Sequence, residues 1–188
     1  IASGQDSLID VRLVSDLEQE REQWIKKPFD YLTSWHVSPS GDRVVLTCRG
    51  EVFVAPTDTG RLVELPRKEG VRYRGAQFAP DGKSLVLQSD ESGEFEFWKA
   101  AANGVSAPER LTTNGRIFRF AEKVSPDGKW LAYSDKDAKF WVMNLETKQP
   151  KLIAEARMDE INDYEWSPDS AWIAFSESAA NLYSQIKL

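Results

Sequence analysis

Residues 125–134 read Ser-Pro-Asp-Gly-Lys-Trp-Leu-Ala-Tyr-Ser, a tight-turn signal followed at once by a short apolar run. Proline presets φ at the second turn position, aspartate accepts hydrogen bonds from nearby backbone N–H groups, and glycine adopts the left-handed conformation of a bulged hairpin. The signal occurs four times, with its prolines at positions 39, 80, 126 and 168, so the intervals are 41, 46 and 42 residues. In the fourth copy Ser170 stands where the other copies have glycine, which predicts a strained or reshaped turn.

The residues behind each turn repeat as well. Three consecutive apolar positions begin five residues after each proline: Val44-Val45-Leu46, Leu85-Val86-Leu87, Leu131-Ala132-Tyr133 and Ile173-Ala174-Phe175. Three apolar residues in a row indicate a strand that is covered on both faces. Short strands with a period of roughly 40–45 residues are typical of propeller blades. The repeat therefore predicts an all-β chain, a β-propeller fragment of about four four-stranded antiparallel blades.

The blade boundaries follow from the turn positions. We expect blades at 31–66, 73–113, 117–154 and 161–188, and the last is expected to be incomplete because it lacks an outer strand. Ahead of them, residues 1–30 predict a strand at 8–14 and a short helix at about 16–25, introduced by a capping box. Either the first strand completes the last blade, or exposed blade faces drive self-association of the chain. The absence of an initiator Met suggests a piece of a longer protein.

Composition restricts the partners. The formal net charge of −6 argues against nucleic acid and against anionic membranes as partners, and no basic stripe is present. No run of eighteen apolar residues occurs, so no membrane-spanning segment is predicted. The single cysteine rules out an intramolecular disulfide and fits a reducing compartment, so we expect a cytoplasmic protein, with the periplasm as the alternative.

The sequence carries little that points to catalysis. His36 is the only histidine, and no Gly-x-Ser-x-Gly elbow accompanies it, so a structural role near a central channel is the better interpretation. Burial explains Cys48 better than reactivity does. No zinc-ligand spacing and no glycine-rich phosphate loop occur. We therefore predict no catalytic residue, no cofactor and no metal site in this chain.

Four arginines precede or begin predicted inner strands, where side chains could face the mouth of the channel. Arginine binds carboxylates well through paired N–H groups. We therefore predict candidate contacts to peptide carboxylates at Arg72, Arg74, Arg116 and Arg119.

Several segments resemble one family. The stretches Arg49-Gly50-Glu51-Val52-Phe53, Gly93-Glu94-Phe95-Glu96-Phe97-Trp98 and Trp166-Ser167-Pro168-Asp169-Ser170-Ala171-Trp172 are similar to the first blades of the second propeller of tricorn-type proteases. The resemblance covers nearly the whole chain. It implies a large serine peptidase whose catalytic region lies outside this chain, so no catalytic residue is carried over.

The resemblance also implies a role. The chain would be a noncatalytic propeller segment that filters or channels peptides and unfolded proteins, with the remaining domains of the parent protease as its partners. Two alternatives stay open. One is a TolB-like protein-interaction scaffold, and the other is the propeller lid of a prolyl oligopeptidase-like hydrolase.

Overall fold

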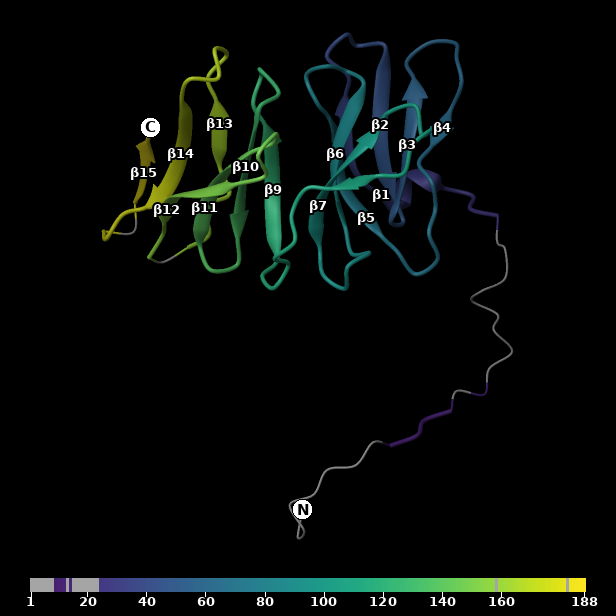
Figure 1. Cartoon of the computed structure of the whole chain (residues 1–188), viewed down its shortest axis with the longest axis horizontal. Coiled ribbons are helices and arrows are strands. Elements are labelled where there is room, and N and C mark those ends of the chain that lie inside the picture. Colours follow the sequence, from purple (N-terminus) through teal and green to yellow (C-terminus); the bar gives the residue numbers. More distant parts are fainter. Residues whose placement is uncertain (1–8, 13, 15–23, 158, 182) are drawn as a thin grey trace.

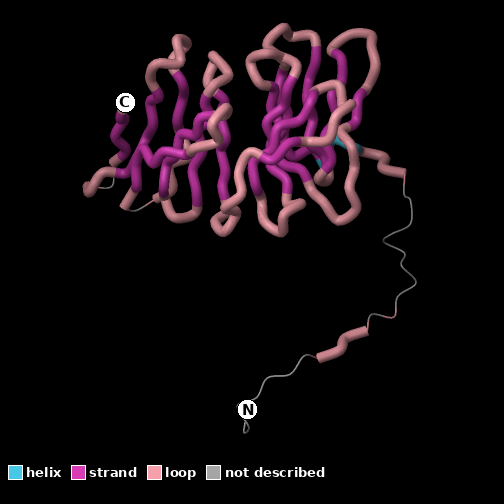
Figure 2. The backbone as a smooth tube through the Cα atoms, viewed as in Figure 1, coloured by secondary structure: helices cyan, strands magenta, loops and turns pink. Residues whose placement is uncertain are grey.

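The computed structural model describes residues 9–12, 14, 24–157, 159–181 and 183–188. Strands and tight turns make up nearly all of this part of the chain. The one helical element among the described residues is the short 3-10 helix η2 (Pro28–Tyr31), as Figure 2 shows.

The strands form four antiparallel sheets, each from one continuous stretch of sequence. Blade one contains β1 (Leu32–Val37), β2 (Arg43–Cys48), β3 (Glu51–Pro56) and β4 (Val63–Glu64). Blade two contains β5 (Tyr73–Phe78), β6 (Ser84–Ser89), β7 (Glu96–Ala101) and β8 (Glu109–Arg110). Blade three contains β9 (Arg119–Val124), β10 (Trp130–Asp135), β11 (Lys139–Asn144) and β12 (Pro150–Glu155). Blade four has three strands, β13 (Tyr164–Trp166), β14 (Ile173–Ser178) and β15 (Ser184–Lys187).

The predicted propeller architecture is confirmed. The sheets stand face to face in chain order, and each pair of neighbours encloses an apolar core (Figure 1). Blade two shows why its second strand needs three apolar residues in a row. Leu85 and Leu87 pack in the core shared with blade one, whereas Val86 packs in the core shared with blade three. All three are almost fully buried.

The four repeat turns have the predicted backbone. The turn glycines Gly41, Gly82 and Gly128 have φ of 73°, 62° and 74°. Ser170 takes the same left-handed conformation with φ of 60°, which confirms the predicted strain, because a side chain disfavours this region. Its Oγ accepts a hydrogen bond from the Asp127 N–H of the preceding turn at 3.0 Å, so the fourth turn is tied to the third.

The N-terminal segment differs from the sequence-based expectation. Of the strand predicted at 8–14, the described residues 9–12 and 14 belong to no strand, and Ile9, Val11 and Val14 are exposed. Most of the helix predicted at about 16–25 lies outside the described residues, and Trp24 and Ile25 are not helical. The described residues therefore place no N-terminal strand against blade four.

Candidate functional site

One cavity is shared by all four blades. It has a volume of about 580 Å³, and its walls come from β1, β5, β9 and β13, the first strand of each sheet. We call it the axial cavity. In each blade the residue three positions before the repeat proline contributes to its lining, and this position is polar or charged every time: His36, Gln77, Lys123 and Glu165. The last two of these residues form an ion pair between blades three and four.

The same position also links the earlier blades. His36 Nδ1 accepts a hydrogen bond from the Phe78 N–H at 3.2 Å, which joins blades one and two. Gln77 Nε2 donates to the Glu122 backbone oxygen at 2.7 Å and joins blades two and three. The inner strands are thus connected by side chains that also face the axial cavity.

A smaller cavity of about 190 Å³ adjoins the axial cavity and shares Ser34, Gly75 and Glu122 with it. We call it the side pocket. Two irregularities in strand pairing create it. β5 has a register shift between Arg74 and Gln77, and β9 has one between its partners of Ala132 and Ser134. Such bulges redirect side chains, and here they bring Gly75 and Glu122 together.

Gly75 makes room for the carboxyl group of Glu122. It has φ of 59°, and a Cβ at this position would collide with Glu122 Oε1. Glu122 Oε2 accepts a hydrogen bond from Gln88 Nε2 at 2.7 Å. Burial raises the pKa of Glu122 to about 7, although hydrogen bonds and the positive charge of Arg74 act in the opposite direction.

The side pocket also holds polar atoms that lack partners. Among the residues that the structure describes, four buried side-chain polar atoms have no hydrogen-bond partner, and three of them belong to lining residues of this pocket: Ser34 Oγ, Gln88 Oε1 and Glu122 Oε1. Gln88 is only 5% exposed. Buried polar atoms are nearly always satisfied, so three orphaned atoms around one cavity are unusual.

Arg119, one of the four predicted peptide contacts, lies at the boundary of blades two and three. It is 5% exposed, and its Nη1 lies 2.7 Å from Glu96 Oε2. Glu96 is 1% exposed and also receives hydrogen bonds from Arg110, from the Thr112 hydroxyl and from the Gly115 N–H. Burial opposes ionisation of Glu96, but the hydrogen bonds from Thr112 and Arg119 outweigh it and hold the pKa of this carboxyl below its usual range. The guanidinium of Arg119 is therefore engaged within the protein.

The other three arginines are exposed. Arg72 Nε lies 2.8 Å from Asp90 Oδ2. The Arg74 guanidinium lies 5.3 Å from the ring centroids of both Phe95 and Phe118, and it borders the side pocket. Contacts of these residues and of Arg116 with peptides stay a prediction.

His36 and Cys48 take part in local structure. Burial lowers the pKa of the half-buried His36 imidazole. Cys48 is only partly buried, and its Sγ lies 3.8 Å from the Pro28 carbonyl oxygen. No cluster of three or more His, Cys, Asp or Glu residues with metal-binding geometry occurs in the described part of the chain. Its helices include none long and apolar enough to cross a membrane.

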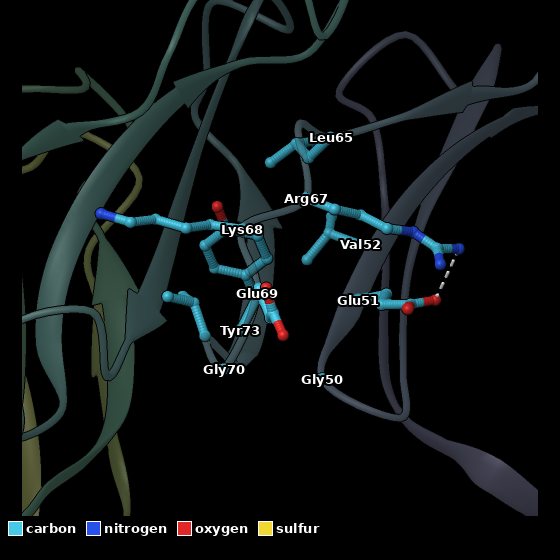
Figure 3. Close-up of a pocket in the computed structure, with 10 residues that line it drawn as sticks. Gly50, Glu51, Val52, Leu65, Arg67, Lys68, Glu69, Gly70 and Tyr73 are labelled. Carbon is cyan, nitrogen blue, oxygen red and sulfur yellow. Dashed lines mark ion pairs between the residues drawn. The ribbon is translucent and has the colours of Figure 1, made fainter. Parts of the chain in front are cut away.

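A third cavity, of about 250 Å³, lies between blades one and two (Figure 3). Its apolar wall includes Val52, Leu65 and Tyr73. Its charged rim is already paired, since Arg67 binds Glu51 and Lys68 binds Glu91. Figure 3 shows Arg67 turned toward Glu51 and Lys68 extending the opposite way. The side pocket, with its unpaired acceptors, is the stronger candidate for a ligand.

Sequence reasoning missed Glu122, although a signal was present. Four residues before the repeat proline, the other blades carry Trp35, Ala76 and Tyr164, whereas blade three carries Glu122. A carboxylate at a position that is otherwise apolar stands out when the segments before the turns are aligned.

The comparisons with known proteins agree with this architecture. The family described as the tricorn protease second beta propeller domain matches residues 32–188. A putative tricorn-like protease C-terminal subunit from Sulfurisphaera tokodaii is 30% identical over 182 residues, which cover 96% of this chain and 20% of that protein. A tricorn protease homolog from Saccharolobus solfataricus is 28% identical over 188 residues, covering 98% of this chain and 16% of the homolog. The chain thus spans about a fifth or less of these relatives.

Solved structures share the fold. The crystal structure of the tricorn protease superposes with a TM-score of 0.68 at 18% identity, covering 85% of this chain and 15% of that one. A putative TolB from Agrobacterium tumefaciens superposes with a TM-score of 0.66, also at 18% identity, covering 82% of this chain and 56% of that one. Sequence and architecture together lead to one assignment: the chain belongs to the family of tricorn protease second β-propeller domains.

Proposed function

We propose that this chain is a noncatalytic wall segment of a peptide passage in a tricorn-like serine protease. The observation that carries the proposal is the axial cavity, to which all four blades contribute their first strand. A propeller places these strands around its central channel, so residues that line the cavity would meet a polypeptide moving along it. Hydrolysis would occur in another part of the parent protein.

The chemistry of the axial cavity supports transit over tight binding. Its polar residues belong to inter-blade contacts, as in the ion pair of Lys123 with Glu165 and the hydrogen bond from Gln77. Side chains held by neighbours give a wall of fixed shape. Selection by such a wall depends on the width of the passage, so unfolded chains would pass and folded domains would not.

The test narrows the passage in the full-length parent protein. Glu165→Trp adds bulk at an inner-strand side chain that is 73% exposed. We expect kcat/KM for an unfolded polypeptide to fall severalfold, while kcat/KM for a chromogenic tripeptide stays within twofold. Glu155→Trp on the outer strand β12 is the matched control and should change neither value. An equal loss for both substrates in Glu165→Trp would contradict the proposal.

A second candidate function is that of a TolB-like interaction scaffold. The structural likeness to TolB favours it, because that likeness is nearly as strong as the likeness to tricorn protease. A scaffold would bind a folded partner at its rim. The two functions differ in the same assay, since a scaffold predicts no difference between the inner-strand and outer-strand tryptophan variants.

A further inference from the structure

We propose that the side pocket between the inner strands of blades one, two and three binds a primary ammonium group, donated by a peptide N-terminus or by a lysine side chain. Placing peptides at this pocket rests on the proposed function, whereas the recognition of an ammonium group rests on the pocket alone. No residue of the pocket is required to perform chemistry.

The unpaired atoms define what the ligand must offer. Ser34 Oγ, Gln88 Oε1 and Glu122 Oε1 all accept hydrogen bonds, and none has a partner. The Gln88 amide is oriented by its own donation to Glu122 Oε2, which leaves its oxygen free for a ligand. A primary ammonium carries three N–H donors and no acceptor, so it matches three free acceptors.

The charge of the pocket favours a cation. Glu122 brings a carboxylate, and an uncompensated buried charge is costly. Arg74 is the positive side chain near it, but its guanidinium is exposed and stacked against the Phe95 and Phe118 rings. An ammonium group inside the pocket would compensate Glu122 directly. An anionic ligand would face three acceptors and gain no donor from them.

Size and lining favour an organic cation over a bare metal ion. The volume of about 190 Å³ is several times the roughly 30 Å³ that one water occupies in the liquid. Phe118 and Phe120 line the pocket, so an aliphatic stem would pack on aromatic rings. Ca²⁺ requires six to eight oxygen ligands as a rule, more than the three free acceptors supply.

The absence of a side chain at Gly75 preserves the site. A methyl group there would displace the Glu122 carboxyl from its place against the β5 backbone. Because Ser34, Gly75 and Glu122 also border the axial cavity, a ligand can enter the side pocket from that cavity.

Isothermal titration of the purified chain at pH 8 with propylammonium chloride tests the proposal. We expect saturable binding that weakens at least tenfold in Glu122→Gln and severalfold in Ser34→Ala. Glu165→Gln, a carboxylate on the same face outside the pocket, should bind as the wild type does. Thermal unfolding followed by circular dichroism checks that each variant is folded.

Two peptide probes identify the source of the ammonium group. Binding of Ala-Ala-Ala-amide but not of its N-acetyl form assigns the pocket to chain termini, and binding of N-acetyl-lysine-methylamide assigns it to lysine side chains. Either result supports the proposal if it depends on Glu122.

Three outcomes would overturn it: no Glu122-dependent binding of any probe, full displacement of propylammonium by equimolar sodium or calcium chloride, or weaker propylammonium binding in Arg74→Gln. The last would indicate a site for anions. Since these readouts need no peptidase activity, the pocket and the proposed passage can fail independently.

Discussion

Two glutamates lie in the inner part of the molecule, and their surroundings differ. Glu96 is surrounded by donors from Arg110, Thr112, Gly115 and Arg119, and its pKa is held below the usual range. Glu122 has one donor, Gln88, and one free oxygen, and burial raises its pKa. The difference shows that burial alone does not make a carboxylate structural. A carboxylate whose acceptors are all used holds blades together, whereas one with a free oxygen is available to a ligand.

The largest test of this comparison removes the charge of Glu96. In Glu96→Gln the guanidinium of Arg119 stays buried without its counter-ion, so we expect the free energy of unfolding at pH 7 to fall by about 3–5 kcal/mol. Chemical denaturation measures this change. A loss below about 1 kcal/mol would mean that the cluster is not the structural element described here.

Glu122→Gln should act in the opposite direction at high pH. The pKa of Glu122 is raised from 4.5 to about 7 in the folded chain, so the folded state binds more protons than the unfolded state between these values. Stability therefore falls as pH rises through this window, by about 3 kcal/mol at most. The Gln variant lacks this term, and its free energy of unfolding should exceed that of the wild type at pH 8 but equal it at pH 4. Parallel pH profiles of the two proteins would refute the raised pKa.

Gly75→Ala tests the cradle beneath Glu122. The left-handed φ of 59° costs an alanine about 1–2 kcal/mol, and the methyl group must also push the Glu122 carboxyl aside. We expect a lower free energy of unfolding, measured by denaturant titration, together with loss of propylammonium binding. The double variant with Glu122→Ala should recover part of the stability, because the collision is gone. Identical losses in the single and double variants would mean that the strain lies in the backbone alone.

Glu165→Gln gives the smallest expected effect and serves as the reference. Glu165 pairs with Lys123 at an exposed position on the axial cavity, where a salt bridge contributes about 0.2–1 kcal/mol. The free energy of unfolding should change by no more than this amount, and the change should shrink in 0.5 M NaCl. A larger, salt-independent loss would place this pair in the same class as Glu96.

The repeat turn and the strand behind it were predictable from sequence because local chemistry determines them. Proline, aspartate and glycine define the turn, and three apolar residues such as Leu85, Val86 and Leu87 require cover on both faces. All four second strands lie where this pattern predicts, as do the three-stranded blade four and its missing partner strand.

The candidate site was harder to predict because it depends on contacts between blades. The bulges in β5 and β9 have no strong local signal, and they bring Gly75 and Glu122 together across 47 residues of sequence. Arg119 illustrates the same limit. Its place at the start of an inner strand suggested the channel mouth, but the burial of its guanidinium follows from Glu96 on the neighbouring blade. Pairing of this kind is a tertiary property.

Ser170 has a consequence for engineering this fold. Aligning the four repeats marks this serine as the deviation to correct, and a consensus design would install glycine to relax the backbone. The exchange would delete the hydroxyl that receives the Asp127 N–H, and with it a joint between the last two blades. Averaging the repeats would therefore erase information that each blade carries about its neighbour.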